Sequence, residues 1–342
     1  MRIQDTQASL FRANAIATNA FLTGGLEPIS QRAEYDEAID HVLAQVADAA
    51  EAQPADREAL RVINQRISAY TNAVTQARDN NRQGYPVGSE YLTDGSTTLR
   101  DQANPVFAEM VTANTDRAEQ ELGAFHPWWL LGMAVLACAV LWHLNRSLAK
   151  RFHRRFNPGL VLAALGIVVL TFFTVSYAAS QNGQNDELLA GDFDQAVTTA
   201  TARSAANDAK ANESLRLIKR GSGQLYEDRW IAAAEIVDDA GIGADWTTYK
   251  ERHAAVVEFD EKGQWEQAVG LATSLEDDGG TFVFDRLDQR LQADVEAAAD
   301  SSTEQLRSNT MGLVLAVVTL LVGLAAAGAA VWGFAQRRRE YA

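Results

Sequence analysis

The sequence has almost no cysteine: Cys138 is the only one in 342 residues, so the chain cannot form an internal disulfide bond. Its five histidines lie in different segments, and none has a cysteine or second histidine at metal-ligand spacing: His41, His126, His143, His153 and His253. We therefore expect no metal site and no cofactor, with each histidine at a surface or an interface. The sequence also carries no nucleophile–base or phosphate-binding motif, which favours a protein that is not an enzyme.

Basic residues are scarce, with 30 Lys and Arg against 45 Asp and Glu, and a net charge of -15. Residues 1–126 hold 18 acidic and 10 basic side chains, and residues 180–308 hold 26 and 12. Because nucleic-acid binding needs a basic face, these acidic segments exclude it. The strongly basic segments are the tail RRREYA and a short turn that carries Arg146, Lys150, Arg151, Arg154 and Arg155.

Long hydrophobic runs flank that basic turn. Trp128–Leu144 and Gly159–Ala179 contain no acidic residue, lysine or arginine, and both are close to the ~20 residues that cross a bilayer. Thr310–Ala335 is a third such run. Short loops rich in Lys and Arg stay in the cytoplasm, so the turn predicts a plasma-membrane protein with both acidic segments outside and the basic turn in contact with the cytoplasm and lipid.

Helical periodicity runs through both outer segments and predicts an all-α, multi-pass membrane protein. The first segment predicts helices over 1–23, 30–52, 57–79 and 88–125, and the second over 193–219, 224–239, 245–275 and 282–309. Each set is expected to form an up-down four-helix bundle continuous with the membrane helices. The predicted divisions are an outer bundle at 1–126, a span at 127–145, the basic turn at 146–157, a span at 158–180, an outer bundle at 181–309, a span at 310–335 and a tail at 336–342.

The two outer segments resemble each other. Ala13-Asn14 and Asn19 match Ala206-Asn207 and Asn212 at an offset of 193, and Leu99 matches Leu291 at 192. Such a nearly constant offset predicts an internal duplication of a unit that includes a membrane helix on each side. A further membrane helix is then expected upstream of Met1; the alternative is insertion with the N-terminus outside and no signal sequence.

The turns between predicted helices expose glycine and proline at the outer tip of each bundle, where a partner can dock. We expect docking at Gly24, Gly25, Leu26, Glu27, Pro28, Arg82, Tyr85 and Pro86 in the first segment, and at Arg220 and Phe282 in the second. The alternative is that these are ordinary loop residues. Small-molecule binding at inward-facing Asn14, Asn19 or Asn212 is a weaker hypothesis.

Three phrases, ATNAFLTGGLEP (17–28), YDEA (35–38) and NNRQGYPVG (80–88), resemble the GlnX-type actinobacterial transmembrane proteins. The paired outer bundles also resemble the four-helix-bundle sensor domains of chemoreceptors. The first resemblance implies a partner lipoprotein that binds solutes outside the cell, sensing of amino acids of the Glu/Asp/Gln class, and a cytoplasmic Ser/Thr protein kinase as the receiver. That family has four membrane helices, whereas this sequence shows three.

The short turn and tail leave too little chain in the cytoplasm for a catalytic domain. The sequence therefore favours a signalling relay between an outer lipoprotein and an inner kinase, with a homodimer as a further candidate assembly. Two alternatives stay open: a structural or envelope-assembly membrane protein, and a direct sensor of a small ligand.

Overall fold

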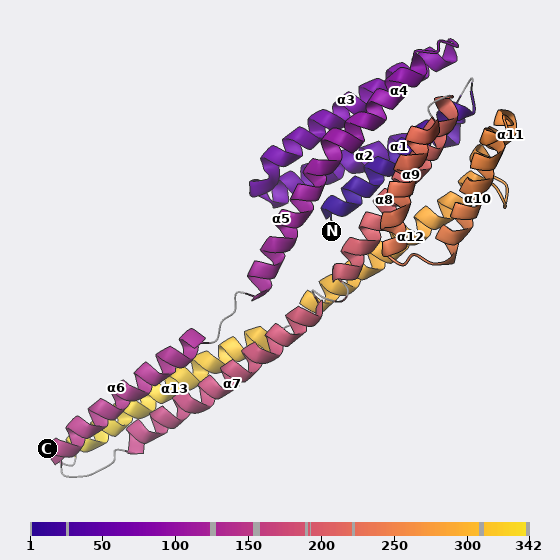
Figure 1. Ribbon diagram of the computed structural model, residues 1–342. Coiled ribbons are helices and arrows are strands. Elements are labelled where there is room, and N and C mark those ends of the chain that lie inside the picture. The colour runs from indigo at the N-terminus through magenta and orange to yellow at the C-terminus, as the bar shows by residue number, and fades with distance from the viewer. Residues whose placement is uncertain are drawn as a thin grey trace. The chain divides into compact units, whose positions relative to one another are not determined.

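The computed structural model describes residues 2–24, 27–123, 128–152, 158–188, 191, 193–220, 223–307 and 311–339 (Figure 1). Every regular element in these ranges is helical, as the sequence predicts. The chain divides into two compact units, Met1–Asp116 with Asp192–Asp300, and Arg117–Gly191 with Ser301–Ala342. We refer to them as the first and second units, and to the two chain segments of the first unit as its first and second halves.

The helices of the first half follow the predicted order. They are α1 (Arg2–Leu22), α2 (Ile29–Ala52), the 3-10 turn η1 (Pro54–Asp56), α3 (Arg57–Arg82), α4 (Gly88–Thr97), the π-helical turn η2 (Thr98–Ala103) and α5 (Asn104–Gly123). Gly24 and Gly84 follow α1 and α3 with φ angles of 67° and 72°, a left-handed conformation that glycine adopts without steric cost. Gly24 and Gly84, from which we predicted a turn after each helix, therefore form the turns after α1 and α3.

The apolar stripes of α2 and α3 form much of the core of the first half. Tyr35, Ile39 and Val42 on α2 are buried with Ile63 and the other apolar residues of the α3 stripe. Leu43, which the sequence places on the α2 stripe, is 40% exposed. Adjacent helical residues point about 100° apart, so Leu43 cannot share the inner face that Val42 occupies.

The second half contains one helix more than predicted. Its elements are α8 (Asp194–Ile218), α9 (Gly223–Asp239), α10 (Ala244–Glu261), α11 (Trp265–Thr273) and α12 (Gly280–Arg307). The prediction of one helix over 245–275 is wrong, because the chain turns at Gly263, whose φ is 73°. The amide of Gln264 donates to the carbonyl of Phe259 at 2.8 Å, which closes the end of α10.

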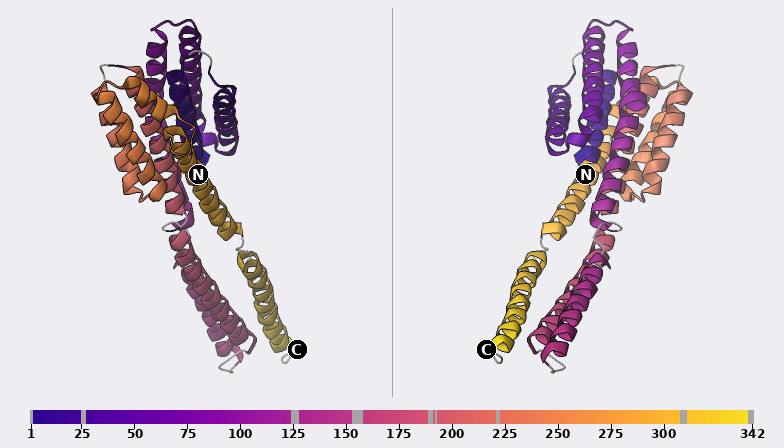
Figure 2. Two further views of the ribbon diagram at one scale, coloured as in Figure 1. Left: turned by 90° about the vertical axis from the view of Figure 1, so that its right-hand side faces the viewer. Right: turned by 90° about the vertical axis from the view of Figure 1, so that its left-hand side faces the viewer.

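Helices α1 and α8 pack against each other at the centre of the first unit (Figure 2). α2 also packs on α1, and α9 and α11 pack on α8, so both central helices are buried on nearly every side. Their many alanine, serine, threonine and asparagine residues allow this close approach. The two predicted outer segments thus form one compact unit; an up-down four-helix bundle within each half, and the predicted domain bounds, stay predictions.

Equivalent hydrogen bonds occur in the two halves. Ser96 Oγ donates to Asn14 Oδ1 at 2.8 Å, and Asn207 Nδ2 donates to Asp288 Oδ1 at 2.7 Å. Asn14 and Asn207 match in the predicted duplication, and Ser96 and Asp288 are related by the offset that relates Leu99 to Leu291. Both leucines are buried. These pairs lie at positions that match in the predicted duplication, and the duplication itself stays a prediction.

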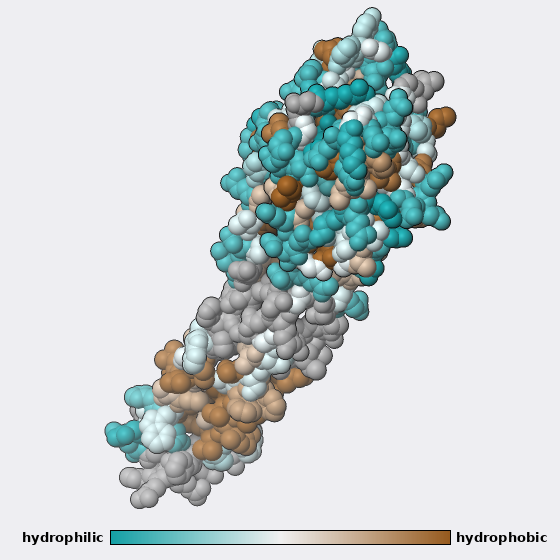
Figure 3. Space-filling view, turned by 45° about the vertical axis from the view of Figure 1, so that its right-hand side comes forward, coloured by the Kyte–Doolittle hydropathy of each residue, from teal (hydrophilic) through white to brown (hydrophobic). Residues whose placement is uncertain are grey.

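The second unit consists of α6 (Trp128–Phe152), α7 (Pro158–Leu188) and α13 (Met311–Arg339), with α7 packed against both others. Gly166 on α7 lies close to α13, because a Cβ at this position would be 3.9 Å from Ala326 Cβ. Many large apolar side chains of these helices are exposed, among them Trp128, Leu162, Phe172 and Leu324. Figure 3 shows hydrophobic surface gathered over this part of the chain. Exposed apolar surface of this extent is typical of contact with lipid or protein.

Within the described residues, Pro158–Gln181 is the one stretch long and apolar enough to cross a membrane, with 24 residues and a mean hydropathy of 2.4. Val317–Ala329 is a shorter apolar helix. These helices are compatible with a membrane protein; the spans at 127–145 and 310–335 and the orientation stay predictions. Arg146 and Lys150 are exposed on α6, Arg151 lies in the same helix, and Arg154 and Arg155 lie outside the described residues.

Candidate functional site

The first predicted docking tip has its two turns side by side. Arg78 near the end of α3 pairs with Glu27 at 2.8 Å, and both line a small cavity together with Arg82. Tyr85 is 55% exposed, and Gly24, Pro28 and Pro86 are also exposed. Gly25 and Leu26 lie outside the described residues. The structure therefore brings Glu27 and Arg82 together and leaves Tyr85 accessible, while docking itself stays a prediction.

The two residues predicted for the second tip lie in different environments. The guanidinium of Arg220 stacks 3.6 Å from the ring centroid of Trp265. Phe282 is half-buried and packs against the core of the second half. In the described part of the chain no contact joins Arg220 to Phe282, so they do not form one anchor.

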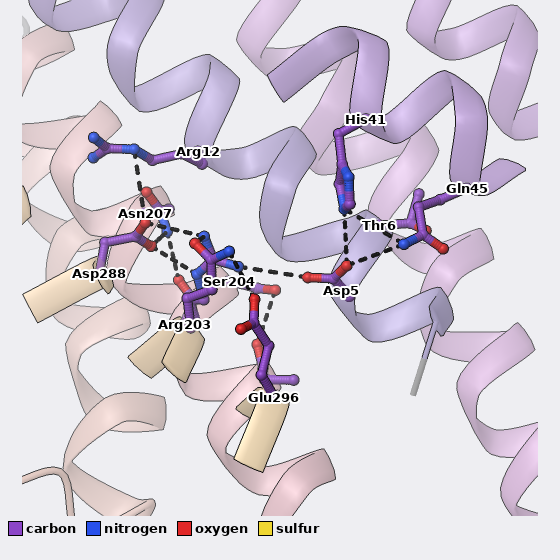
Figure 4. A network of polar contacts seen from close by, with 12 residues as sticks. Asp5, Thr6, Arg12, His41, Gln45, Arg203, Ser204, Asn207, Asp288 and Glu296 are labelled. Carbon is purple, nitrogen blue, oxygen red and sulfur yellow. Dashed lines mark hydrogen bonds and ion pairs between the residues drawn. The ribbon is translucent and has the colours of Figure 1, made fainter. Parts of the chain in front are cut away.

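A buried ionic cluster connects the two halves near the middle of α8 (Figure 4). Arg203 donates to both carboxylate oxygens of Asp288 on α12, at 2.9 and 3.0 Å, and also lies 3.6 Å from Asp5 on α1. Arg12 on α1 reaches the same Asp288 at 3.7 Å and Asp285 at 2.8 Å. Bidentate arginine–carboxylate pairs of this kind fix both distance and orientation, so they set the register between α1, α8 and α12.

Electrostatics keep the cluster charged. Burial disfavours the carboxylate form of Asp288, but attraction from Arg203 and Arg12 outweighs burial and lowers the pKa of Asp288 below its usual value. Asp5 extends the cluster to α2, where its carboxylate lies 3.0 Å from His41 Nε2. The ionic cluster therefore connects α1, α2, α8 and α12, which come from both halves of the first unit.

A further link between the halves comes from the π-helical turn η2. Arg100 in this turn donates to Asp208 on α8 at 2.6 and 3.2 Å, and to Asn212 at 3.1 Å. π-Helical turns inside α-helices occur frequently at functional sites, because the extra residue redirects a side chain. Here Arg100 bonds to Asn212, the residue that matches Asn19 in the predicted duplication.

A second buried ionic cluster lies within the second half. Lys210 Nζ lies 2.7 Å from Glu213, whose other oxygen lies 2.9 Å from Nδ1 of His253 on α10. Nε2 of His253 faces Glu227 at 3.3 Å, and Glu227 pairs with Arg216 at 3.2 Å. Ionised carboxylates only accept hydrogen bonds, so two carboxylates facing the two ring nitrogens favour the doubly protonated imidazolium.

The pKa values in this cluster follow from its charges. Burial disfavours charged Glu213, but Lys210 and His253 outweigh it and lower the pKa of Glu213 to about 2. Burial also disfavours charged His253, but hydrogen bonds to Glu213 and Glu227 outweigh it and raise its pKa. The prediction of a surface or interface position is wrong for His253, which is buried and stacks 3.8 Å from the ring of Trp230. His41 and His143 are exposed, and His126 and His153 lie outside the described residues.

We expect a stability maximum from this cluster at mildly acidic pH. The raised pKa of His253 adds stability below about 6.5, which is lost as the pH rises through its folded-state pKa. The lowered pKa of Glu213 adds stability above about 4.5, which is lost as the pH falls toward about 2. In the purified full chain, the thermal midpoint should therefore fall above neutral pH, and His253→Gln should flatten that fall.

The control for this pH profile is His41→Gln, because the imidazole of His41 is 47% exposed and solvent screens its charge. It should keep the wild-type profile. An unchanged alkaline decline in His253→Gln would contradict the assignment of the decline to His253.

The inward asparagines predicted as ligand positions are bonded to protein groups. Asn14 bonds to Ser96, and Asn19 Nδ2 donates to Thr281 at 3.1 Å. Asn212 bonds to Arg100 and Asp208. These residues therefore hold helices together across the first unit. Among the described residues, no group of three or more His, Cys, Asp or Glu side chains is placed to hold a metal ion.

Comparison with known proteins finds a family to which the first segment of the chain is similar. Residues 1–123 match the family model of the actinobacterial sensor domain. The match covers the first half of the first unit and supports a sensor-type actinobacterial protein. No curated protein and no solved structure matches the chain.

Proposed function

We propose that the chain is a non-enzymatic transmembrane signalling relay, in which the first unit senses conditions outside the cell and the membrane helices carry the response inward. The main support is the ionic contact between the sensor-domain segment and the second half, through the pairs Arg12–Asp285, Arg100–Asp208 and Asp5–Arg203. Because breaking buried pairs is costly, movement of one half is transmitted to the other instead of being absorbed between them.

The proposed input is an extracytoplasmic solute-binding lipoprotein that carries an amino acid of the Glu/Asp/Gln class. Its proposed docking surface is the first tip, where Tyr85 and Pro86 are exposed beside the Glu27–Arg78 pair. The proposed receiver is a cytoplasmic Ser/Thr protein kinase that contacts the predicted basic turn, of which Arg146 and Lys150 are exposed near the end of α6. The exposed apolar helices of the second unit are proposed to lie in the plasma membrane.

The test is isolation of the full chain from native membranes after mild cross-linking, with identification of the proteins that accompany it. We expect a solute-binding lipoprotein and a Ser/Thr kinase. Tyr85→Ala should lower recovery of the lipoprotein by about tenfold, since exposed aromatic anchors dominate many interfaces. Leu43→Ala is the matched control, because Leu43 is an exposed apolar residue on α2 outside the predicted tip.

Two outcomes would contradict this proposal. Absence of a lipoprotein from the cross-linked sample would remove the proposed input. A deletion strain with altered cell shape and unchanged kinase output would instead favour a structural or envelope-assembly protein.

A further inference from the structure

The first unit contains a cavity of about 230 Å³ between α1, η2, α8 and α9, so both halves contribute to its walls. Its lining combines apolar groups with charged ones, among them Phe11, Ala233, Ile236, Arg100, Asp208 and Arg229.

Arg100 lines this cavity, and one of its hydrogen-bond donors is covered by protein atoms and has no partner. Its Nε and Nη2 atoms bond to Asp208 and Asn212, whereas Nη1 is buried and has no partner among the described residues. Buried polar atoms in folded proteins nearly always have a partner, and an unsatisfied donor costs free energy. A bound acceptor would remove that cost.

Arg229 supplies a second positive charge at the same cavity. It lies on α9, half-buried, with its guanidinium 5.7 Å from the ring of Tyr226. In the part of the chain that the structure describes, no carboxylate pairs with it. Since Asp208 balances Arg100, the charged lining has an excess of one positive charge, in a protein with a net charge of -15.

We propose that this cavity binds a small organic carboxylate with an apolar body. The carboxylate pairs with Arg229, and the guanidinium of Arg100 turns so that Nη1 also donates to it, because planar guanidinium groups suit carboxylate geometry. The apolar body lies against Phe11, Ala233 and Ile236. The excess positive charge disfavours a cation, and the apolar wall favours an organic acid over an inorganic anion.

A ligand bound in this cavity would contact both halves of the first unit. Phe11 and Arg100 belong to the first half, and Asp208 and Arg229 to the second, so the ligand would bridge them beside the π-helical turn. This inference deepens the sensing role proposed above by adding a directly bound ligand, although the binding itself requires no lipoprotein or kinase.

The test uses the full chain purified in detergent, with pentanoate and benzoate as probes and pentanamide and benzamide as neutral controls. Binding is measured by ligand-observed NMR titration. We expect at least one acid to bind saturably and its amide to bind at least tenfold more weakly. Arg229→Gln should weaken acid binding about tenfold or more, because it removes one of two charged donors.

Arg290→Gln is the matched control, since it removes the same charge from an arginine on α12 that pairs with Asp245 and does not line the cavity. It should leave binding within twofold of wild type. Ala232→Trp, at an exposed cavity residue, should block binding without changing the core. The proposal is overturned if neither acid binds, if acid and amide bind equally, or if Arg229→Gln binds as well as Arg290→Gln.

These results are separable from the relay. Acid binding by a chain that recovers no lipoprotein would retain the ligand site and reject the relay. Recovery of lipoprotein and kinase by a chain that binds neither acid would support the relay and reject the ligand site.

Discussion

Arg203→Met is expected to lower the free energy of unfolding of the first unit by about 3–5 kcal/mol, because it leaves Asp288 buried without its bidentate partner. The side chains of Arg203 and Asp288 are 5% and 6% exposed, so water cannot replace the lost contact. Arg12 lies 3.7 Å from Asp288 and offsets only part of the charge. Amide hydrogen exchange of peptides from α8 and α12, measured by mass spectrometry on the full chain, should accelerate more than a hundredfold.

Two variants isolate the cause. Arg61→Met removes an arginine from the exposed Arg61–Glu58 pair and should leave exchange nearly unchanged, since exposed pairs contribute little. The double variant Arg203→Met with Asp288→Leu replaces the pair by apolar groups and should recover much of the loss. If the double variant is as unstable as the sum of the single variants, the uncompensated charge of Asp288 is not the cause.

The helices of the first half could be predicted from local signals. Apolar residues at helical spacing placed α2 and α3, while Gly24, Pro54 and Gly84 marked turns. The same reasoning missed the turn at Gly263, because one glycine between polar residues is tolerated in a helix. It also missed η2, since a π-helical turn changes hydrogen bonding by one residue and leaves no distinct composition.

The ionic clusters could not be predicted in the same way. Lys210 and Glu213 are three residues apart on one helix, so their pairing was visible in the sequence, but not their burial. Arg203 and Asp288 are 85 residues apart, and their contact depends on how α8 and α12 pack. Charged residues are almost never fully buried unless they are paired, so a single sequence places them on the surface by default.

One signal for that burial was present. The α8 sequence has small residues on all sides, and the matching positions in α1 carry alanine and asparagine too. Small residues around a whole helix indicate close neighbours on several faces. The predicted duplication therefore indicated that the first helix of each half is central, although it did not indicate that the two pack against each other.

Lys210→Met is expected to have the other large effect, again about 3–5 kcal/mol, because it isolates one of the most deeply buried charges. Lys210 and Glu213 are 2% and 1% exposed, and Lys210 also donates to the carbonyl of Ala272 at 2.8 Å. Removing the ammonium leaves Glu213 with His253 as its one cationic neighbour, so the pKa of Glu213 should rise. Stability should then decline at a higher pH during acidification than in wild type.

The measurement is the thermal midpoint of the full chain from about pH 2 to about pH 8, which covers the acid-side loss expected for Glu213, together with hydrogen exchange of α8 and α10. Lys262→Met is the control, because Lys262 pairs with Glu258 at an exposed position on the end of α10. Lys210→Met with Glu213→Leu should regain most of the midpoint and lose the acid-side decline attributed to Glu213. Equal losses in Lys210→Met and Lys262→Met would show that burial of the Lys210–Glu213 pair does not control the stability of the second half.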